Sequence, residues 1–126
     1  MPLTRIALRA GKPPAYRRAI MENVYRAMRE TFEVPEDDYF MTVTQHDEDE
    51  FWFSADYLGI PRSDDLVIIQ IAANDTRGVA QKKALYKRIA ERLAAEPGLR
   101  PEDVFINLVE VARENWSFGR GIAQYA

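Results

Sequence analysis

Pro2 has the residue type and position needed for proton transfer. It stands directly behind Met1, so removal of Met1 would leave a secondary amine. The ordinary pKa of an α-amino group is about 7.7–8.0, and apolar or cationic surroundings lower it, so this amine would be a base at neutral pH. The alternative interpretation is structural, because proline is also tolerated as the first residue of a strand.

The segment Trp116–Gly121 is the second candidate for chemistry. Trp116 and Phe118 can form an apolar pocket wall, while Arg120 supplies a positive charge between two glycines that permit a tight turn or a hairpin. Equally, these aromatic residues could lie in a hairpin that packs on a neighbouring subunit. The two interpretations are compatible if the pocket lies at an interface.

Several other kinds of chemistry are excluded by composition. The 126 residues include no cysteine and one histidine, His46, which rules out thiol nucleophiles, disulfides, zinc-thiolate sites and multi-histidine metal sites. We interpret the acidic run 47–50 as a solvated loop, so no metal site is expected. The net charge of −3 argues against a nucleic-acid partner, and the absence of a long apolar run argues against a membrane partner. We expect a cytoplasmic protein.

Hydrophobic periodicity indicates which elements would position these groups. Strands are expected at 3–8, 39–45, 51–53, 66–73 and 104–111. The first strand is followed by prolines and then by apolar residues at helical spacing up to residue 32; a second helix follows residue 78 and ends near Pro97. The strand at 66–73 is almost continuously apolar, so we expect it to be buried on both faces.

The two halves of the chain repeat this order. The segment 35–40 resembles the segment 101–106, which indicates an offset of 66 residues. We therefore predict a single α/β (α+β) domain over 1–126, built from duplicated β-α-β units at about 2–60 and about 62–126. Parallel strands within each unit would give a four-stranded sheet with both helices on one face. The other face would then need cover from further copies of the chain.

Nearly the whole sequence resembles the tautomerase superfamily, whose members act through an amino-terminal proline. The resemblance rests on Pro2 before a duplicated β-α-β pattern and on the matching segments 34–39, 42–46, 81–83 and 116–121. It is strongest for the malonate semialdehyde decarboxylase branch and its uncharacterised tautomerase relatives. It implies a homotrimer with active sites near subunit boundaries, and it implies no cofactor.

The same resemblance implies roles for individual residues. Pro2 matches the catalytic proline and Asp38 the catalytic aspartate of the decarboxylase branch, while Arg77 matches the second member of its arginine-x-arginine pair. Asp75 stands where the first arginine is expected, and this difference weakens the case for decarboxylation more than the case for proton transfer. Other residues are expected to line the pocket: Tyr39, Trp116, Phe118 and Arg120.

These assignments have structural alternatives. Arg77 could be a solvated residue near the start of a helix, Asp38 could be a turn or cap residue, and Tyr39 could belong to the core. The favoured function is a cofactor-independent keto-enol tautomerase, in which Arg77 holds the carboxylate of a small 2-keto acid or its enol and Pro2 is the general base. One alternative is a malonate semialdehyde decarboxylase or hydratase, and another is a non-catalytic trimeric binding protein.

Overall fold

Two antiparallel central strands organise the sheet in the computed structural model, which describes residues 2–126. β1 (Leu3–Arg9) pairs with β3 (Val67–Asn74), and each central strand has a parallel neighbour on its outer side. These neighbours are β2 (Phe40–His46) and β4 (Val104–Val111), which gives the strand order β2-β1-β3-β4. The predicted four-stranded sheet and the parallel pairing within each half are therefore confirmed.

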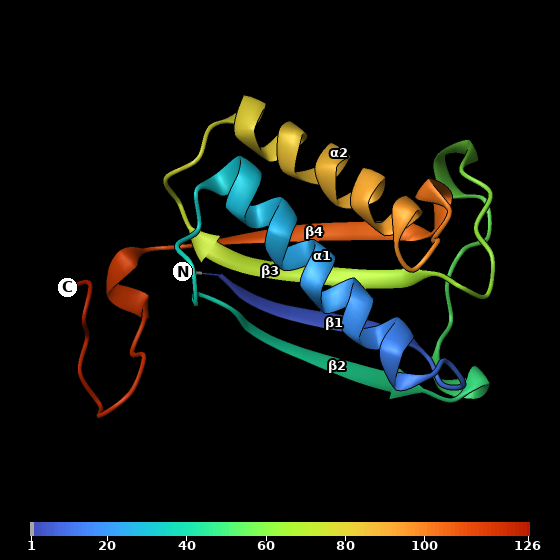
Figure 1. Cartoon of the computed structure of the whole chain (residues 1–126), viewed down its shortest axis with the longest axis horizontal. Helices are drawn as coiled ribbons and strands as arrows, with labels where there is room; N and C mark the ends of the chain where they lie inside the picture. Colours follow the sequence, from blue (N-terminus) through green and yellow to red (C-terminus); the bar gives the residue numbers. More distant parts are fainter. Residues whose placement is uncertain (1) are drawn as a thin grey trace.

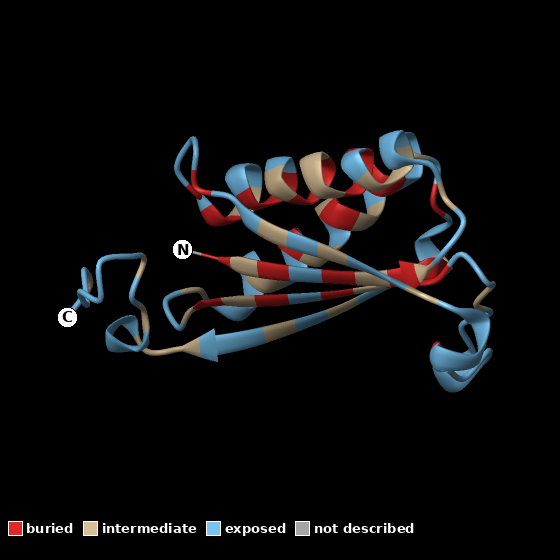
Figure 2. Cartoon of the chain, turned by 90° about the horizontal axis from the view of Figure 1, so that it is seen from below, coloured by how far each residue is buried: buried red, intermediate tan, exposed pale blue. Residues whose placement is uncertain are grey.

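Two helices cover one face of this sheet, as Figures 1 and 2 show, and they are α1 (Pro14–Phe32) and α2 (Val79–Ala95). α1 begins with proline at its first position, where a missing N–H costs no helical hydrogen bond. The equivalent elements of the two halves begin 64 or 65 residues apart, close to the offset of 66 in the sequence. The duplicated β-α-β architecture is thus present in the fold.

The hydrophobic core lies between the helices and the inner face of the sheet. Alternate residues of β1 and β3 point toward the helices, and residues at helical spacing on α1 and α2 meet them. Burial of this apolar surface is the main contribution to stability. Fully buried members of the core are Ile20, Val24, Met28, Val67, Ile69, Ile71, Leu85, Ile89 and Leu93.

The other face of the sheet has no helix over it within residues 2–126. β3 alternates between buried residues on the helix side and partly or fully exposed residues on the other side, with Gln70 exposed. The prediction that this strand is buried on both faces is therefore wrong for a single chain. Apolar residues that remain exposed on this side include Phe105 at 46% and Phe40 at 52%.

One further expectation about regular structure is also wrong, and of the tight turn or hairpin expected at Trp116–Gly121 the turn is present. Residues 51–53 are not a strand, because Phe51 instead packs against His46 at 5.8 Å and the next residue, Trp52, is fully exposed. The segment after β4 is not a hairpin; it contains a short 3₁₀ turn (Arg113–Asn115) followed by further turns. In the described part of the chain, no helix has the length and apolar character needed to cross a membrane.

Candidate active site

Four segments from distant parts of the sequence meet at one end of the sheet. Leu3 at the start of β1 lies opposite Phe40 at the start of β2 and opposite Ala72 near the end of β3. The residues just before β1 and β2 and just after β3 and β4 must therefore lie at this end, where Figure 1 also shows the N-terminus. Pro2 is the buried residue that precedes β1. The fate of Met1 lies outside the described residues.

Asp38 is a buried acid at this end of the sheet. Its backbone N–H donates to the carbonyl of Pro35 at 3.2 Å, so the turn after α1 fixes its position, while its side chain is only 6% exposed. Burial raises the pKa of the Asp38 carboxyl above its ordinary value, and the positive charge of Arg77 partly opposes that rise. Asp38 is thus both a turn residue and a carboxyl group that holds a proton more tightly than usual.

Arg77 lies against the end of α1 and is half-buried. Its Nη2 donates to the carbonyl of Phe32 at 2.8 Å, and its guanidinium carbon lies 4.7 Å from the centre of the Phe32 ring. A cation is favoured here because the last carbonyls of a helix carry partial negative charge. Arg77 is therefore half-buried rather than fully solvated, and its positive charge acts on the Asp38 carboxyl.

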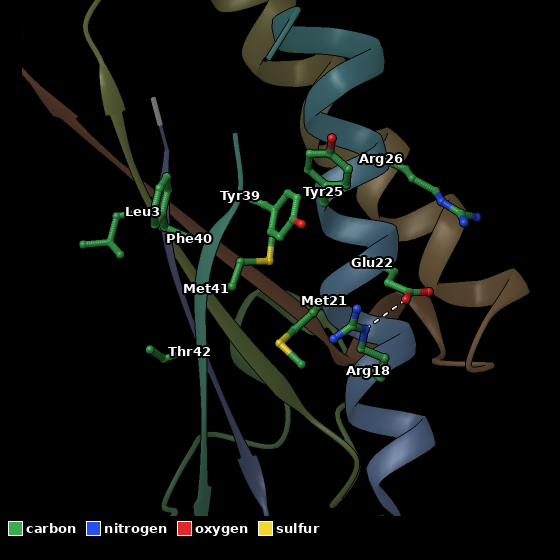
Figure 3. Close-up of a pocket in the computed structure, with 10 residues that line it drawn as sticks. All are labelled: Leu3, Arg18, Met21, Glu22, Tyr25, Arg26, Tyr39, Phe40, Met41 and Thr42. Atoms are coloured by element: carbon green, nitrogen blue, oxygen red, sulfur yellow. Dashed lines mark hydrogen bonds and ion pairs between the residues drawn. The ribbon is translucent and has the colours of Figure 1, made fainter. Parts of the chain in front are cut away.

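Tyr39 lies on the outer side of the molecule, in a groove between α1 and β2 that Figure 3 shows. Its ring meets the ring of Tyr25 edge-on at 5.1 Å, and Met21 and Met41 line the groove beside it. The groove has a volume of about 750 Å³ and is open to solvent. Tyr39 therefore lines a cavity rather than the core, since 56% of the residue is exposed.

The residues predicted to form an aromatic wall, Trp116 and Phe118, lie in the segment that follows β4. Trp116 and Phe118 stack at 5.4 Å, and Tyr125 meets Phe118 edge-on at 5.0 Å. The indole N–H of Trp116 donates to Oδ1 of Asn74 at 2.7 Å, which ties this wall to the end of β3. Arg120 is exposed in a turn with φ of 60°. These contacts join the wall to the sheet rather than to Asp38 or Arg77.

Asp75 and the acidic run 47–50 are both exposed. The Asp75 N–H donates to the carbonyl of Val111 at 3.1 Å, so its backbone continues the β3–β4 pairing. At the other end of β2, carboxylate oxygens of Asp47, Asp49 and Glu50 lie within 4.8 Å of one another in a surface turn. That turn is remote from Asp38 because β2 separates them.

Sequence reasoning missed Phe32 and Asn74. Phe32 supplies both the ring and the carbonyl that hold Arg77, but in the sequence it is one more apolar residue at helical spacing. Asn74 accepts the hydrogen bond of Trp116 and ends an otherwise apolar strand. A polar residue at the end of such a strand is the signal that could have identified Asn74.

Comparison with known proteins identifies the family. A family model described as "Tautomerase enzyme" matches residues 38–119. The chain belongs to this tautomerase family. It is 41% identical over 124 residues to "Probable tautomerase YusQ" of Bacillus subtilis (strain 168), an alignment that covers 98% of each protein.

Solved structures agree with this membership. The fold of a malonate semialdehyde decarboxylase matches with a TM-score of 0.92 at 32% identity, covering 98% of this chain and 95% of that one. A fused 4-OT solved as a symmetric trimer matches with a TM-score of 0.79 at 15% identity, covering 95% and 94%. The predicted tautomerase family and tautomerase fold are therefore confirmed.

Proposed function

We propose that this tautomerase family member is a cofactor-independent keto-enol tautomerase of a small 2-keto acid or its enol. Pro2 is its general base once Met1 has been removed. The observation that carries the proposal is that Pro2, the buried Asp38 and the loop of Arg77 lie at the same end of the sheet. The 41% identity to a protein named as a probable tautomerase supports the same reaction class.

Each group has a defined task in this mechanism. One of the five N–H donors of Arg77 is used on Phe32, so the guanidinium retains donors for a substrate carboxylate. The neutral nitrogen of Pro2 removes the proton from the enol hydroxyl. The electron pair of that O–H bond forms the carbonyl, and the carbon–carbon double bond takes the proton back from protonated Pro2 at carbon.

Asp38 supports these proton movements through its environment. Burial raises the pKa of the Asp38 carboxyl, and we assign this carboxyl the role of orienting a water molecule or acting as the partner acid. A cation such as Arg77 at the same end of the sheet favours the neutral form of the Pro2 amine, which is the form that the mechanism needs. Tyr39, Trp116, Phe118 and Arg120 complete the proposed substrate pocket.

The active form that we propose is a homotrimer. The sheet face without helices exposes Phe40, Phe105 and Val109, and an apolar sheet face is expected to pack against another element. Copies of the chain can cover it for one another, and a fused 4-OT of similar fold is a symmetric trimer. Each aromatic wall would then lie close to a subunit boundary.

A second candidate is a decarboxylase or hydratase that acts on malonate semialdehyde. It is favoured by the likeness to malonate semialdehyde decarboxylase at 32% identity and by the presence of Asp38 and Arg77. It is weakened by Asp75, which stands where the first arginine of the decarboxylase branch's arginine-x-arginine pair is expected.

Ketonisation of an aryl pyruvate enol tests the favoured function directly. Intact-mass measurement first establishes that Met1 is absent from the protein used, because an acylated Pro2 nitrogen has no basicity. Pro2→Ala should then lower kcat/KM by about a hundredfold or more, the usual contribution of a general base. Pro61→Ala is the matched control, because Pro61 is an exposed loop residue.

The same preparation is given malonate semialdehyde, and carbon dioxide release is measured. Carbon dioxide release without ketonisation would favour the decarboxylase instead. Absence of both activities in protein with a free Pro2 amine would favour the non-catalytic binding protein.

A further inference from the structure

Asn74 is a polar residue at the point where β3 ends and the loop to Arg77 begins. In β3 the residues Val67, Ile69, Ile71 and Ala73 are buried toward the helices, so Asn74 belongs to the alternate set on the open face. Its Oδ1 accepts the indole N–H of Trp116 at 2.7 Å, and this bond is partly buried. An indole nitrogen can only donate, so Trp116 needs an acceptor at this position.

The backbone beside Asn74 fixes the same junction. The N–H of Asp75 donates to the carbonyl of Val111 at 3.1 Å, which extends the β3–β4 pairing one residue beyond the strands. After β4 the chain makes a short 3₁₀ turn (Arg113–Asn115), which brings the Trp116 ring back to the end of β3. The backbone that carries Asn74 is therefore held by the β3–β4 pairing, and its side chain offers Trp116 an acceptor at a fixed place on the sheet.

The other contacts of the C-terminal segment are made within the segment itself. Phe118 stacks on Trp116, and its backbone N–H donates to Oε1 of Gln124 at 3.0 Å. Arg113 lies over the ring of Tyr125 at 5.3 Å. Among the hydrogen bonds of residues 2–126, the one from Trp116 to Asn74 joins residues 116–126 to the sheet. The aromatic wall is thus a preformed unit with one polar attachment.

We propose that Asn74 is a positioning residue that sets the place of the Trp116–Phe118 stack relative to the loop that carries Arg77. The inference rests on the proposed function, because it assigns the stack to the substrate wall. Asn74 lies three residues before Arg77, so one short segment aligns the apolar wall and the cation that holds the carboxylate. Its neutral amide provides the acceptor without placing another negative charge beside an anionic substrate.

Tryptophan fluorescence tests the attachment itself. Trp52 is fully exposed, so Trp52→Phe leaves Trp116 as the single reporter. In that background, Asn74→Leu should shift Trp116 emission to longer wavelength and increase its quenching by acrylamide. Asn74→Asp, which retains an acceptor oxygen, should restore the original spectrum. Gln70→Leu is the matched control, because it removes a hydrogen bond of 3.0 Å to Asn107 on the same face of β3.

Steady-state kinetics with an aryl pyruvate enol test the positioning role. Asn74→Leu should raise KM about fivefold with little change in kcat, as expected for the loss of one hydrogen bond that organises substrate binding. In a double-mutant cycle with Trp116→Phe, which keeps a ring but has no N–H, the effect of Asn74→Leu should disappear.

The outcomes separate this inference from the proposed function. Unchanged Trp116 fluorescence in Asn74→Leu, or additive effects in the cycle, would overturn the positioning role even if the wild-type protein ketonises its substrate. If the wild-type protein shows no ketonisation, the proposed function fails. Fluorescence then still decides whether Asn74 positions a ligand-binding wall. Added phenylpyruvate should quench the Trp116 emission of the wild-type side chain at position 74, and this quenching should be lost in Asn74→Leu.

Discussion

Neutralising Asp38 should lower activity strongly and stabilise the fold at the same time. The side chain is 6% exposed, and burial raises the pKa of its carboxyl above the ordinary value of 3.8. Each unit by which folding raises this pKa means that the charged carboxylate destabilises the folded state by about 1.4 kcal/mol at neutral pH. Asp38→Asn has nearly the same shape and carries no charge, so it removes this cost.

The sign of the pH dependence follows from the raised pKa. The folded protein binds the Asp38 proton more tightly than the unfolded chain does, so wild-type stability falls as pH rises from about 3.8 through the raised pKa. The stability of Asp38→Asn does not fall with pH in this way, because asparagine does not titrate. Its melting temperature should therefore be close to that of the wild type at pH 4 and higher at pH 8. About 1 kcal/mol corresponds to roughly 3–5 °C for a domain of this size.

Thermal unfolding at the two pH values and ketonisation kinetics at pH 7 measure both effects. Asp38→Asn should lower kcat by about a hundredfold or more if the carboxyl takes part in proton transfer. Asp37→Asn is the matched control, because this neighbouring acid is exposed and asparagine tolerates its φ of 68°. A stability difference that is the same at pH 4 and pH 8, or full activity in Asp38→Asn, would refute the reasoning.

Two further predictions concern cations at the helix ends and faces. Arg77→Lys keeps the charge but loses the planar guanidinium, so kcat/KM should fall about tenfold or more. The free energy of unfolding should also fall by about 1 kcal/mol, because the hydrogen bond to Phe32 is lost. An unchanged KM for the acid would contradict the carboxylate-binding role. Glu30 bridges Arg88 and Arg92 of α2, which lower its pKa to about 2. Since its side chain is 36% exposed, Glu30→Gln should cost only about 1 kcal/mol in urea unfolding at pH 7. The difference should shrink as pH falls from 4.5 toward 2, and an effect that persists there would show that charge is not its cause.

Much of the fold could be predicted because its elements are set by local patterns. The apolar alternation of the first strand and the helical spacing up to Phe32 place elements that the structure confirms. The repeated β-α-β order also predicted that the two strands of each half pair in parallel, and the structure confirms this for β1 with β2 and for β3 with β4. Residues 51–53 show the limit of such patterns, because an apolar run becomes a strand only where another strand is available to pair with it.

The candidate site was less accessible to sequence reasoning. Pro2, Asp38 and Arg77 could be named from the family resemblance, and whether each of them is catalytic stays a prediction. No local pattern predicts that Arg77 lies against Phe32 or that Trp116 bonds to Asn74, because those contacts join positions more than forty residues apart.

The sequence by itself determined the duplicated β-α-β architecture, the family and the reactive groups available, because periodicity and residue type are properties of short segments. Only the tertiary structure decided which of those groups meet. The register between β1, β2 and β3 brings Pro2, Asp38 and the loop of Arg77 to one end of the sheet. The same packing buries Asp38, and the loss of water around its carboxyl raises the pKa of that group.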